Sequence, residues 1–182
     1  MIFNSIEELQ KELMYFRGDL IYCTSCPGDP LHEGHIECLN ACGEMSNHQN
    51  CKFVVIVNSD EFLIRKKGYC LLPLKTRMAV INNLKCNPWV VPWDDGTQNV
   101  AGALKIIKPC TFCKGGDRTA ETMDKEELKV CNEIHCQIKY GVGGYDKKAS
   151  SSDFVKNAIK QLQGNTQIYR NCVVYNNPSH LS

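Results

Sequence analysis

The chain has 182 residues, with 21 basic and 20 acidic side chains and a formal charge of +1 at pH 7. A near-neutral charge creates no global field toward nucleic acid or an anionic membrane, so we expect neither as a partner, and any phosphate binding has to be local. Glu7, Glu8, Lys11 and Glu12 lie where a signal peptide would be apolar, and no apolar run approaches ~18 residues. We therefore expect a cytoplasmic protein of one domain.

The first half of the chain alternates between helical and strand patterns. Ser5 followed by Glu8 is a capping-box pattern, which predicts an opening helix that ends near Gly18. Continuous apolar runs predict buried strands, and apolar positions three or four residues apart predict helices. In chain order the next segments are the strand DLIYCT, a helix from Glu33, the strand CKFVVIVNS and the helix LKTRMAVINNL.

The second half continues the alternation. Its segments are the strand PWVVPW, the helix NVAGALKII closed by Pro109, the strand CTFCK, the helix KEELKVCNEI, the strand CQIKYGV and a last helix that begins among the serines at 150–152. The tail contains QIYRNCVVY, which fits an added edge strand. We expect an N-terminal helix over 1–18, a main domain over 19–163 and a tail over 164–182.

Strands that alternate with helices need right-handed crossovers. This predicts an α/β fold of Rossmann-like type, with a doubly wound, mostly parallel five-stranded sheet and helices on both faces. In such sheets, ligands bind outside the carboxyl ends of the strands, where the strand order reverses. The residues with possible chemical roles follow predicted strands. The histidines at 32–35 follow the first strand and residues 65–68 follow the second. Residues 114–117 follow the fourth strand and residues 150–152 follow the fifth.

Twelve cysteines require a choice between disulfides, a metal site and plain packing. Without an export signal, reduced thiols are the expectation. Cys23 and Cys26, and Cys110 and Cys113, have the spacing of two zinc half-sites. The second pair falls in a predicted strand, where residues i and i+3 point to opposite faces and do not converge on one ion. We therefore expect packing, and a zinc-organised interaction module stays as an alternative.

His32 and His35 stand at the start of a predicted helix, where free N–H groups and the helix dipole favour an anion. Their spacing places both rings on one side of the helix, and Gly34 between them lets a phosphate approach the backbone. Two imidazoles can donate to a phosphate that gains charge in a transition state. The motif by itself leaves open a phosphate cradle and a pair of surface histidines.

Other strand ends offer matching groups. Lys66 and Lys67 could reach phosphates across the same cleft, although a charge run is ordinarily a solvated face. The serines at 150–152 add hydroxyls and free N–H groups at another helix start. Arg77, on a predicted helix, fits a surface role as well as a phosphate role. The segment 115–117 fits a tight turn or the close approach of a ribose or base, with its aspartate accepting a hydrogen bond.

The stretch YCTSCPGDPLHEGHIECLNAC resembles the opening motif of the nucleotidylyltransferase superfamily, in which a strand leads through an aspartate-containing loop into His-x-Gly-His. The similarity continues in VIVNSDEFLIRKKG, RMAVINNLKCNPWVVPWDD, IIKPCTFCKGGD and KKASSSDFV. Within the superfamily, Asn-Ser-Asp and Lys-Gly-Gly-Asp are most similar to sugar-phosphate adenylyltransferases such as heptose-phosphate adenylyltransferase. Glycerol-phosphate and phosphoethanolamine cytidylyltransferases are similar at nearly every motif, and archaeal-type FAD synthetase is more distant.

The resemblance implies a reaction. An acceptor phosphate attacks the α-phosphate of ATP or CTP in line and releases pyrophosphate, without a covalent enzyme intermediate. His32, His35 and Lys67 would be the catalytic residues, with the histidines steadying the α-phosphate as charge builds. Mg²⁺ would bridge the triphosphate oxygens, bound through substrate and water, so that no metal is held mainly by the protein. Relatives are often homodimers, which we also expect here.

The resemblance also implies binding residues. The acceptor phosphate would be bound by Arg65, Lys66 and Lys148. The nucleotide would be bound by Cys26, Pro27, Gly28, Asp29, Gly34, Arg77, Gly115, Gly116, Asp117, Ser150, Ser151 and Ser152.

Two segments depart from the family pattern. Relatives usually have Gly-x-Phe-Asp where this chain has Cys-Pro-Gly-Asp at 26–29, so the aromatic residue is missing. Many relatives have an arginine before the last helix, a role that would fall here to Lys147 or Lys148. These departures bear on the substrate more than on the reaction. The alternatives are a phosphoethanolamine- or FMN-type nucleotidylyltransferase and a catalytically inactive nucleotide-binding homologue.

Overall fold

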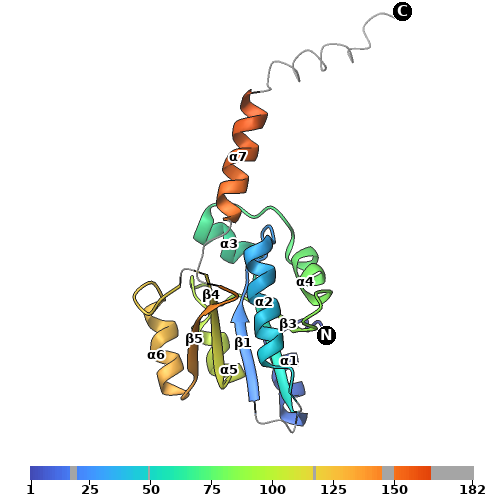
Figure 1. Ribbon diagram of the computed structural model, residues 1–182, viewed down its shortest axis with the longest axis vertical. Coiled ribbons are helices and arrows are strands. Elements are labelled where there is room, and N and C mark those ends of the chain that lie inside the picture. Colours follow the sequence, from blue (N-terminus) through green and yellow to red (C-terminus); the bar gives the residue numbers. More distant parts are fainter. Residues whose placement is uncertain (17–19, 49, 117, 145–149, 165–182) are drawn as a thin grey trace, which may run out of the picture. The chain divides into compact units, whose positions relative to one another are not determined.

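The computed structural model describes residues 1–16, 20–48, 50–116, 118–144 and 150–164 (Figure 1). The chain divides into two compact units, residues 1–148 and 149–182. The first unit contains a five-stranded sheet, and the second contains α7 (Ser151–Gly164). The domain boundaries expected from the sequence stay a prediction.

The elements of the first unit follow the predicted alternation. The strands are β1 (Leu20–Ser25), β2 (Cys51–Asn58), β3 (Trp89–Trp93), β4 (Thr111–Gly115) and β5 (Gln137–Val142). The helices are α1 (Ile6–Tyr15), α2 (Glu33–Met45), α3 (Asp60–Lys67), α4 (Leu74–Asn82), α5 (Ala101–Ile107) and α6 (Lys125–Glu133).

The strands pair in the order β3-β2-β1-β4-β5, and each of these neighbouring pairs is parallel. The chain moves outward from β1 through β2 to β3, and then outward from β4 to β5 on the other side. The order therefore reverses between β1 and β4, where Thr24 lies opposite Cys113. The predicted Rossmann-like fold is confirmed, and the expected site belongs at the carboxyl ends of these two strands.

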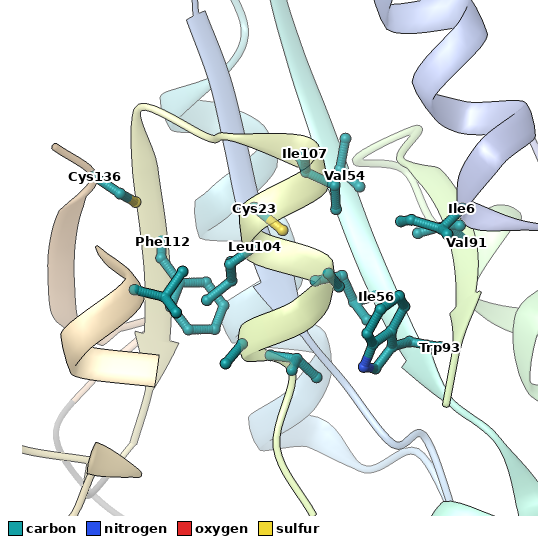
Figure 2. Close-up of a cluster of buried hydrophobic side chains, with 14 of the residues drawn as sticks. Ile6, Cys23, Val54, Ile56, Val91, Trp93, Leu104, Ile107, Phe112 and Cys136 are labelled. Atoms are coloured by element: carbon teal, nitrogen blue, oxygen red, sulfur yellow. The ribbon is translucent and has the colours of Figure 1, made fainter. Parts of the chain in front are cut away.

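Alternation along the buried strand β2 divides the core between the two faces of the sheet. Val54 and Ile56 pack into a cluster with α1, α5 and α6, whereas Val55 and Val57 pack into a cluster with α2 and α4. Figure 2 shows the first cluster, in which Leu104 of α5 lies against the sheet. Figure 1 shows α2 in front of the sheet and α5 behind it. Both faces are covered, which explains why the strand is almost continuously apolar.

The first residues of the chain extend the edge of the sheet. Ile2 forms a parallel bridge with Val90, and the Val90 N–H donates to the Met1 carbonyl at 2.9 Å. The helix α1 then packs Ile6 and Leu9 into the same core cluster as α5. The predicted N-terminal helix is thus part of the α/β core.

The helix α3 was not predicted, and its signals are visible in retrospect. The Ser59 hydroxyl accepts a hydrogen bond from the Phe62 N–H at 2.9 Å, Asp60 and Glu61 occupy the first turn, and Gly68 caps the end. Acidic residues at the start of a helix and basic residues at its end both complement the helix dipole. The basic run at 65–67 is therefore the last turn of a helix rather than a strand tail.

Candidate active site

The two histidines of the His-x-Gly-His stretch lie at the first turn of α2. His32 is the N-cap residue and His35 lies one turn on. Their rings stack with centroids 3.8 Å apart and planes inclined by 29°. The α2 helix begins a few residues after β1, so the pair stands at the reversal point of the sheet. The prediction that both rings lie on one side of the helix is confirmed.

Both imidazoles are held neutral at physiological pH. Burial lowers the pKa of His35 to about 4, and the neighbouring His32 and Lys67 add to the effect. Burial also lowers the pKa of His32, although Glu33 opposes this and Lys67 reinforces it. His35 Nδ1 is buried and has no hydrogen-bond partner in the part of the chain that the structure describes. Such a neutral ring can donate its one N–H to an added anion without first gaining a proton.

Lys67 comes from a different element but acts on the same pair. Its charge lowers the pKa of both histidines, which places its ammonium group within electrostatic range of their rings. It occupies the last position of α3 and is partly exposed. The structure therefore stacks two of the three residues expected to be catalytic and couples the third to them electrostatically, and their catalytic roles stay a prediction.

Two glycines let the backbone approach close to these groups. A Cβ on Gly34 would lie 3.4 Å from the His32 ring, in contact with it. A Cβ on Gly115, at the end of β4, would lie only 2.7 Å from Cys38 Sγ. Since Cys38 lies one turn beyond His35 on α2, the predicted ribose and base segment packs directly behind the histidine turn. Gly115 is required there for this packing, whatever it does for a nucleotide.

Asp29 lies in the loop between β1 and α2 and is fully buried. Its carboxylate accepts hydrogen bonds from the Leu71 N–H at 2.9 Å and from the Leu72 N–H at 2.8 Å. Both amides belong to the connection between α3 and α4. The predicted nucleotide contact of Asp29 stays untested, but its oxygens already have backbone partners.

Arg77 is also fully buried, so its predicted surface alternative is wrong. It donates to the Pro27 and Asn58 carbonyls at 2.7 Å each, to the Leu72 carbonyl at 2.8 Å and to Asp60 Oδ1 at 2.6 Å. The helix α4 turns this residue inward because its apolar face, with Met78 and Ile81, is buried against the sheet. Periodicity alone did not distinguish an inward arginine from an outward one.

Arg65 and Lys66, the predicted acceptor residues, contact the loop after β3. Arg65 forms two hydrogen bonds with the Asp94 carboxylate and one with the Thr97 carbonyl. Lys66 donates to the Gln98 carbonyl at 3.0 Å, and burial lowers its pKa. The structure thus gives both residues protein partners in the loop after β3. Their role in acceptor binding stays a prediction.

The remaining predicted residues fall into two groups. Cys26, Pro27 and Gly28 lie in the loop between β1 and α2, and the Cys26 N–H donates to the Ile56 carbonyl at 2.9 Å. Gly116 follows β4 directly. Ser150 precedes α7, and its carbonyl accepts from the Asp153 N–H at 3.0 Å. In the second unit α7 also contains Ser151 and Ser152, whereas Asp117, Lys147, Lys148 and the tail segment QIYRNCVVY lie outside the described residues.

The cysteines of the described segments are free thiols. Burial raises the pKa of Cys26 to about 12, although the Gly28 amide, Lys67 and Arg77 oppose the rise. Within residues 1–16, 20–48, 50–116, 118–144 and 150–164, no three His, Cys, Asp or Glu side chains are grouped so as to hold a metal ion. None of the helices described there is long and apolar enough to span a membrane.

Sequence reasoning missed two residues that shape this region, Cys38 and Gly143. A Cβ on Gly143, just after β5, would lie 2.6 Å from the Cys38 backbone nitrogen. The glycine-rich sequence GVGG at the end of a strand was an available signal for such a close approach. Two strand ends therefore converge on one turn of α2.

A family model described as cytidylyltransferase-like matches residues 29–161. The chain belongs to the cytidylyltransferase-like family. Its relationship to the nucleotidylyltransferase superfamily, predicted from the motifs, is therefore confirmed, and the family indicates a nucleotidylyltransferase. The matched residues begin at Asp29 and include the histidine turn, α3, β4 and most of α7.

The chain is also similar to curated relatives and, in its fold, to a solved structure. The chain is 31% identical over 152 residues to the bifunctional protein HldE of Vibrio parahaemolyticus, and 36% identical over 152 residues to that of Vibrio cholerae. Each match covers 81% of this chain and 29% of the relative, so the chain spans less than a third of the relatives' length. The structure of a lipopolysaccharide core biosynthesis protein from Thermoplasma volcanium superposes with a TM-score of 0.55 and 23% identity, over 71% of this chain and all of that one. This last likeness supports the fold alone.

Proposed function

We propose that this chain transfers a nucleoside monophosphate from ATP or CTP to a phosphorylated small acceptor, a sugar or polyol phosphate, and releases pyrophosphate. The observation that carries the proposal is the stacked His32–His35 pair at the start of α2, beside the reversal point of the sheet. Family membership supports the reaction class. The resemblance to sugar-phosphate adenylyltransferases makes ATP with a sugar phosphate the first pair to test.

In the proposed reaction an oxygen of the acceptor phosphate attacks the α-phosphorus in line, and the bond from that phosphorus to the pyrophosphate oxygen breaks. The two imidazoles donate to the oxygens on which charge develops, aided by the free N–H groups of the first turn of α2. Burial lowers the pKa of both rings and so favours their neutral forms before substrate binds. The negative charge of a bound triphosphate would raise those pKa values. Lys67, whose charge lowers the pKa of both histidines, is proposed to hold the phosphates of the triphosphate and of the acceptor.

Magnesium is proposed to enter with the triphosphate, whose charge it partly neutralises when bound. Two carboxylates, one in the β1–α2 loop and one in α3, are already engaged, since Asp29 binds two amides and Asp60 binds Arg77. Phosphate oxygens and water would therefore be the main ligands. Asp117 and the serines at 150–152 are proposed to bind the ribose and the leaving pyrophosphate, respectively.

The direct test is a matrix of ATP and CTP against sugar, polyol and amino-alcohol phosphates and FMN, read by pyrophosphate release with Mg²⁺ present. We expect turnover with a sugar or polyol phosphate, and the His32→Ala variant is the matched control. Turnover only with phosphoethanolamine or FMN would replace the proposed acceptor. Nucleotide binding without pyrophosphate release from any pair would identify an inactive homologue. Sedimentation of the same sample tests the expected homodimer.

A further inference from the structure

Two segments that carry the proposed phosphate residues are joined by two buried charged side chains. One segment is the β1–α2 loop, which leads into His32, and the other is the α3–α4 connection, which follows Lys67. We propose that Arg77 and Asp29 are positioning residues that hold these two segments in one fixed arrangement, so that the histidine pair and Lys67 face the same phosphate. This inference rests on the proposed function.

We call the hydrogen bonds that Arg77 and Asp29 form between these two segments the joint. Arg77 supplies one half of the joint. A guanidinium has five N–H donors. The guanidinium of Arg77 donates four hydrogen bonds, to acceptors at four places in the chain. The Pro27 carbonyl belongs to the histidine loop, the Asn58 carbonyl to the end of β2, and the Leu72 carbonyl to the α3–α4 connection. All four distances are between 2.6 and 2.8 Å, and the side chain is 0% exposed. A planar guanidinium in this position fixes the distances between those backbone segments.

Asp29 supplies the other half of the joint, and it accepts hydrogen bonds where Arg77 donates them. It projects from the histidine loop and accepts from two consecutive amides, Leu71 and Leu72, of the α3–α4 connection. Leu72 is therefore held at both its N–H and its carbonyl, by Asp29 and Arg77 respectively. The joint constrains the connection in orientation as well as in distance.

The position of the joint gives it a role in catalysis. Asp29 lies three residues before His32, and Leu71 lies four residues after Lys67. A displacement on the order of 1 Å of a catalytic group can lower a rate by about 100-fold. By holding both segments, Asp29 and Arg77 are thus placed to prevent a displacement of the histidines or Lys67 that would lower the catalytic rate.

The chemistry of burial favours positioning over direct substrate binding. A buried charge is costly, and replacing both partners of a buried ion pair by apolar side chains of similar volume often gives equal or better stability, whereas removing one partner is destabilising. An ion whose bonds go mainly to backbone atoms therefore specifies geometry at some cost in stability. A phosphate that bound Arg77 directly would have to displace carbonyls that hold the loop.

The kinetic test uses three variants in the full chain. Arg77→Lys keeps the charge but cannot span four acceptors, and Asp29→Asn keeps the shape but removes the charge. Both should lower kcat on the order of 10- to 100-fold while KM for the triphosphate changes less than about threefold. Lys105→Met is the matched control, because it breaks the exposed ion pair of Lys105 with Glu133 far along α5, and it should leave both constants unchanged. A rise in KM with unchanged kcat would overturn the inference in favour of direct binding.

A second measurement does not depend on turnover. The imidazole NMR signals of His32 and His35, assigned with single histidine variants, report the burial and stacking of the pair. In Arg77→Lys and in Asp29→Asn we expect the His35 pKa to rise by at least about one unit from its value near 4, toward that of a solvated ring.

The two measurements separate the inference from the proposed function. If wild-type protein turns over no substrate pair, the proposed function fails, and the titration still decides whether the joint holds the histidines. Unchanged His35 titration in both variants would overturn the inference even if kcat fell. If Arg77→Lys does not fold, Asp29→Asn carries the same test, since its backbone partners tolerate a neutral acceptor.

Discussion

Two ion pairs of this protein each join an arginine to an aspartate, and they differ mainly in the solvent exposure of the arginine. We call these two places the first and second corners. At the first corner Arg77 is 0% exposed and binds Asp60 together with three backbone carbonyls. At the second corner Arg65 is 33% exposed and binds Asp94 together with the Thr97 carbonyl. Arg65 lowers the pKa of Asp94 to about 2, so this pair stays ionised over the whole physiological range.

The difference shows that residue type does not determine what an arginine does. Arg65, after the second strand, was predicted to bind the acceptor phosphate, and Arg77, on a predicted helix, was predicted to bind the nucleotide with a surface role as the alternative. In the fold, Arg77 replaces water for several backbone groups, whereas Arg65 ties a surface loop to the end of α3. The role of Arg77 depends on burial, and that of Arg65 hardly does. Substitutions at the two positions should therefore change the free energy of unfolding by very different amounts.

The largest expected effect is the loss of the buried arginine. Arg77→Met should lower the free energy of unfolding by about 3–5 kcal/mol, because three carbonyls and Asp60 lose their donor. Urea denaturation followed by circular dichroism measures this, with Arg77→Lys expected in between. A loss below about 1 kcal/mol would mean that the two corners are energetically alike.

The histidine pair should titrate in the folded state only at acidic pH. Because the folded-state pKa of His35 is about 4, below that of an exposed histidine near 6.5, protonation favours the unfolded chain. Stability is therefore fully present above pH 6.5 and declines as the pH falls toward 4, by at most about 3 kcal/mol. His35→Gln should flatten this decline, as measured by thermal unfolding between pH 7 and 4. An equal decline in the variant would show that the His35 ring is solvated.

The same pair should dominate catalysis. His32→Ala should lower turnover on the order of 100-fold or more, since a donor to the developing charge is lost. Steady-state kinetics with the correct substrate pair measure it, and His135→Ala, on a segment after α6, is the control. Turnover within a few-fold of wild type would contradict the catalytic assignment.

A smaller effect should come from the glycine packed against α2. Gly115→Ala should cost about 1–3 kcal/mol, because its Cβ would lie 2.7 Å from Cys38 Sγ. The double variant with Cys38→Ala should recover part of this loss, since the sulfur is then absent. Gly116→Ala is the comparison, because its Cβ meets nothing within 4 Å and only its φ of +60° is unfavourable. Simple additivity of the Gly115 and Cys38 changes in a denaturation cycle would refute the contact.

The smallest expected effect is at the exposed corner. Arg65→Met should change the free energy of unfolding by less than about 1 kcal/mol, because the partly exposed pair is screened by solvent. If Arg65 also binds the acceptor, KM for the acceptor will rise in this variant. An unchanged KM would leave Arg65 with the loop as its only partner.

Much of the fold could be predicted from local pattern. The strands and most helices follow apolar periodicity, and the Ser5 hydroxyl accepts from the Glu8 N–H at 3.3 Å as the capping-box pattern predicts. The Glu8 carboxylate, however, binds the Asn4 N–H rather than that of Ser5. The helix α3 was missed because its eight residues contain few apolar positions, which makes the periodicity weak.

The sequence by itself determined the alternating fold class, the family and the place of the histidine pair, because these depend on local periodicity and on a motif contained within one turn. Only the tertiary structure decided that Arg77 and Asp29 face inward, that Arg65 and Lys66 bind the loop after β3, and that Gly115 lies against Cys38. Those outcomes depend on which segments meet across the sheet, and a hydrogen bond between residues 42 or 50 positions apart leaves no periodic trace in the chain.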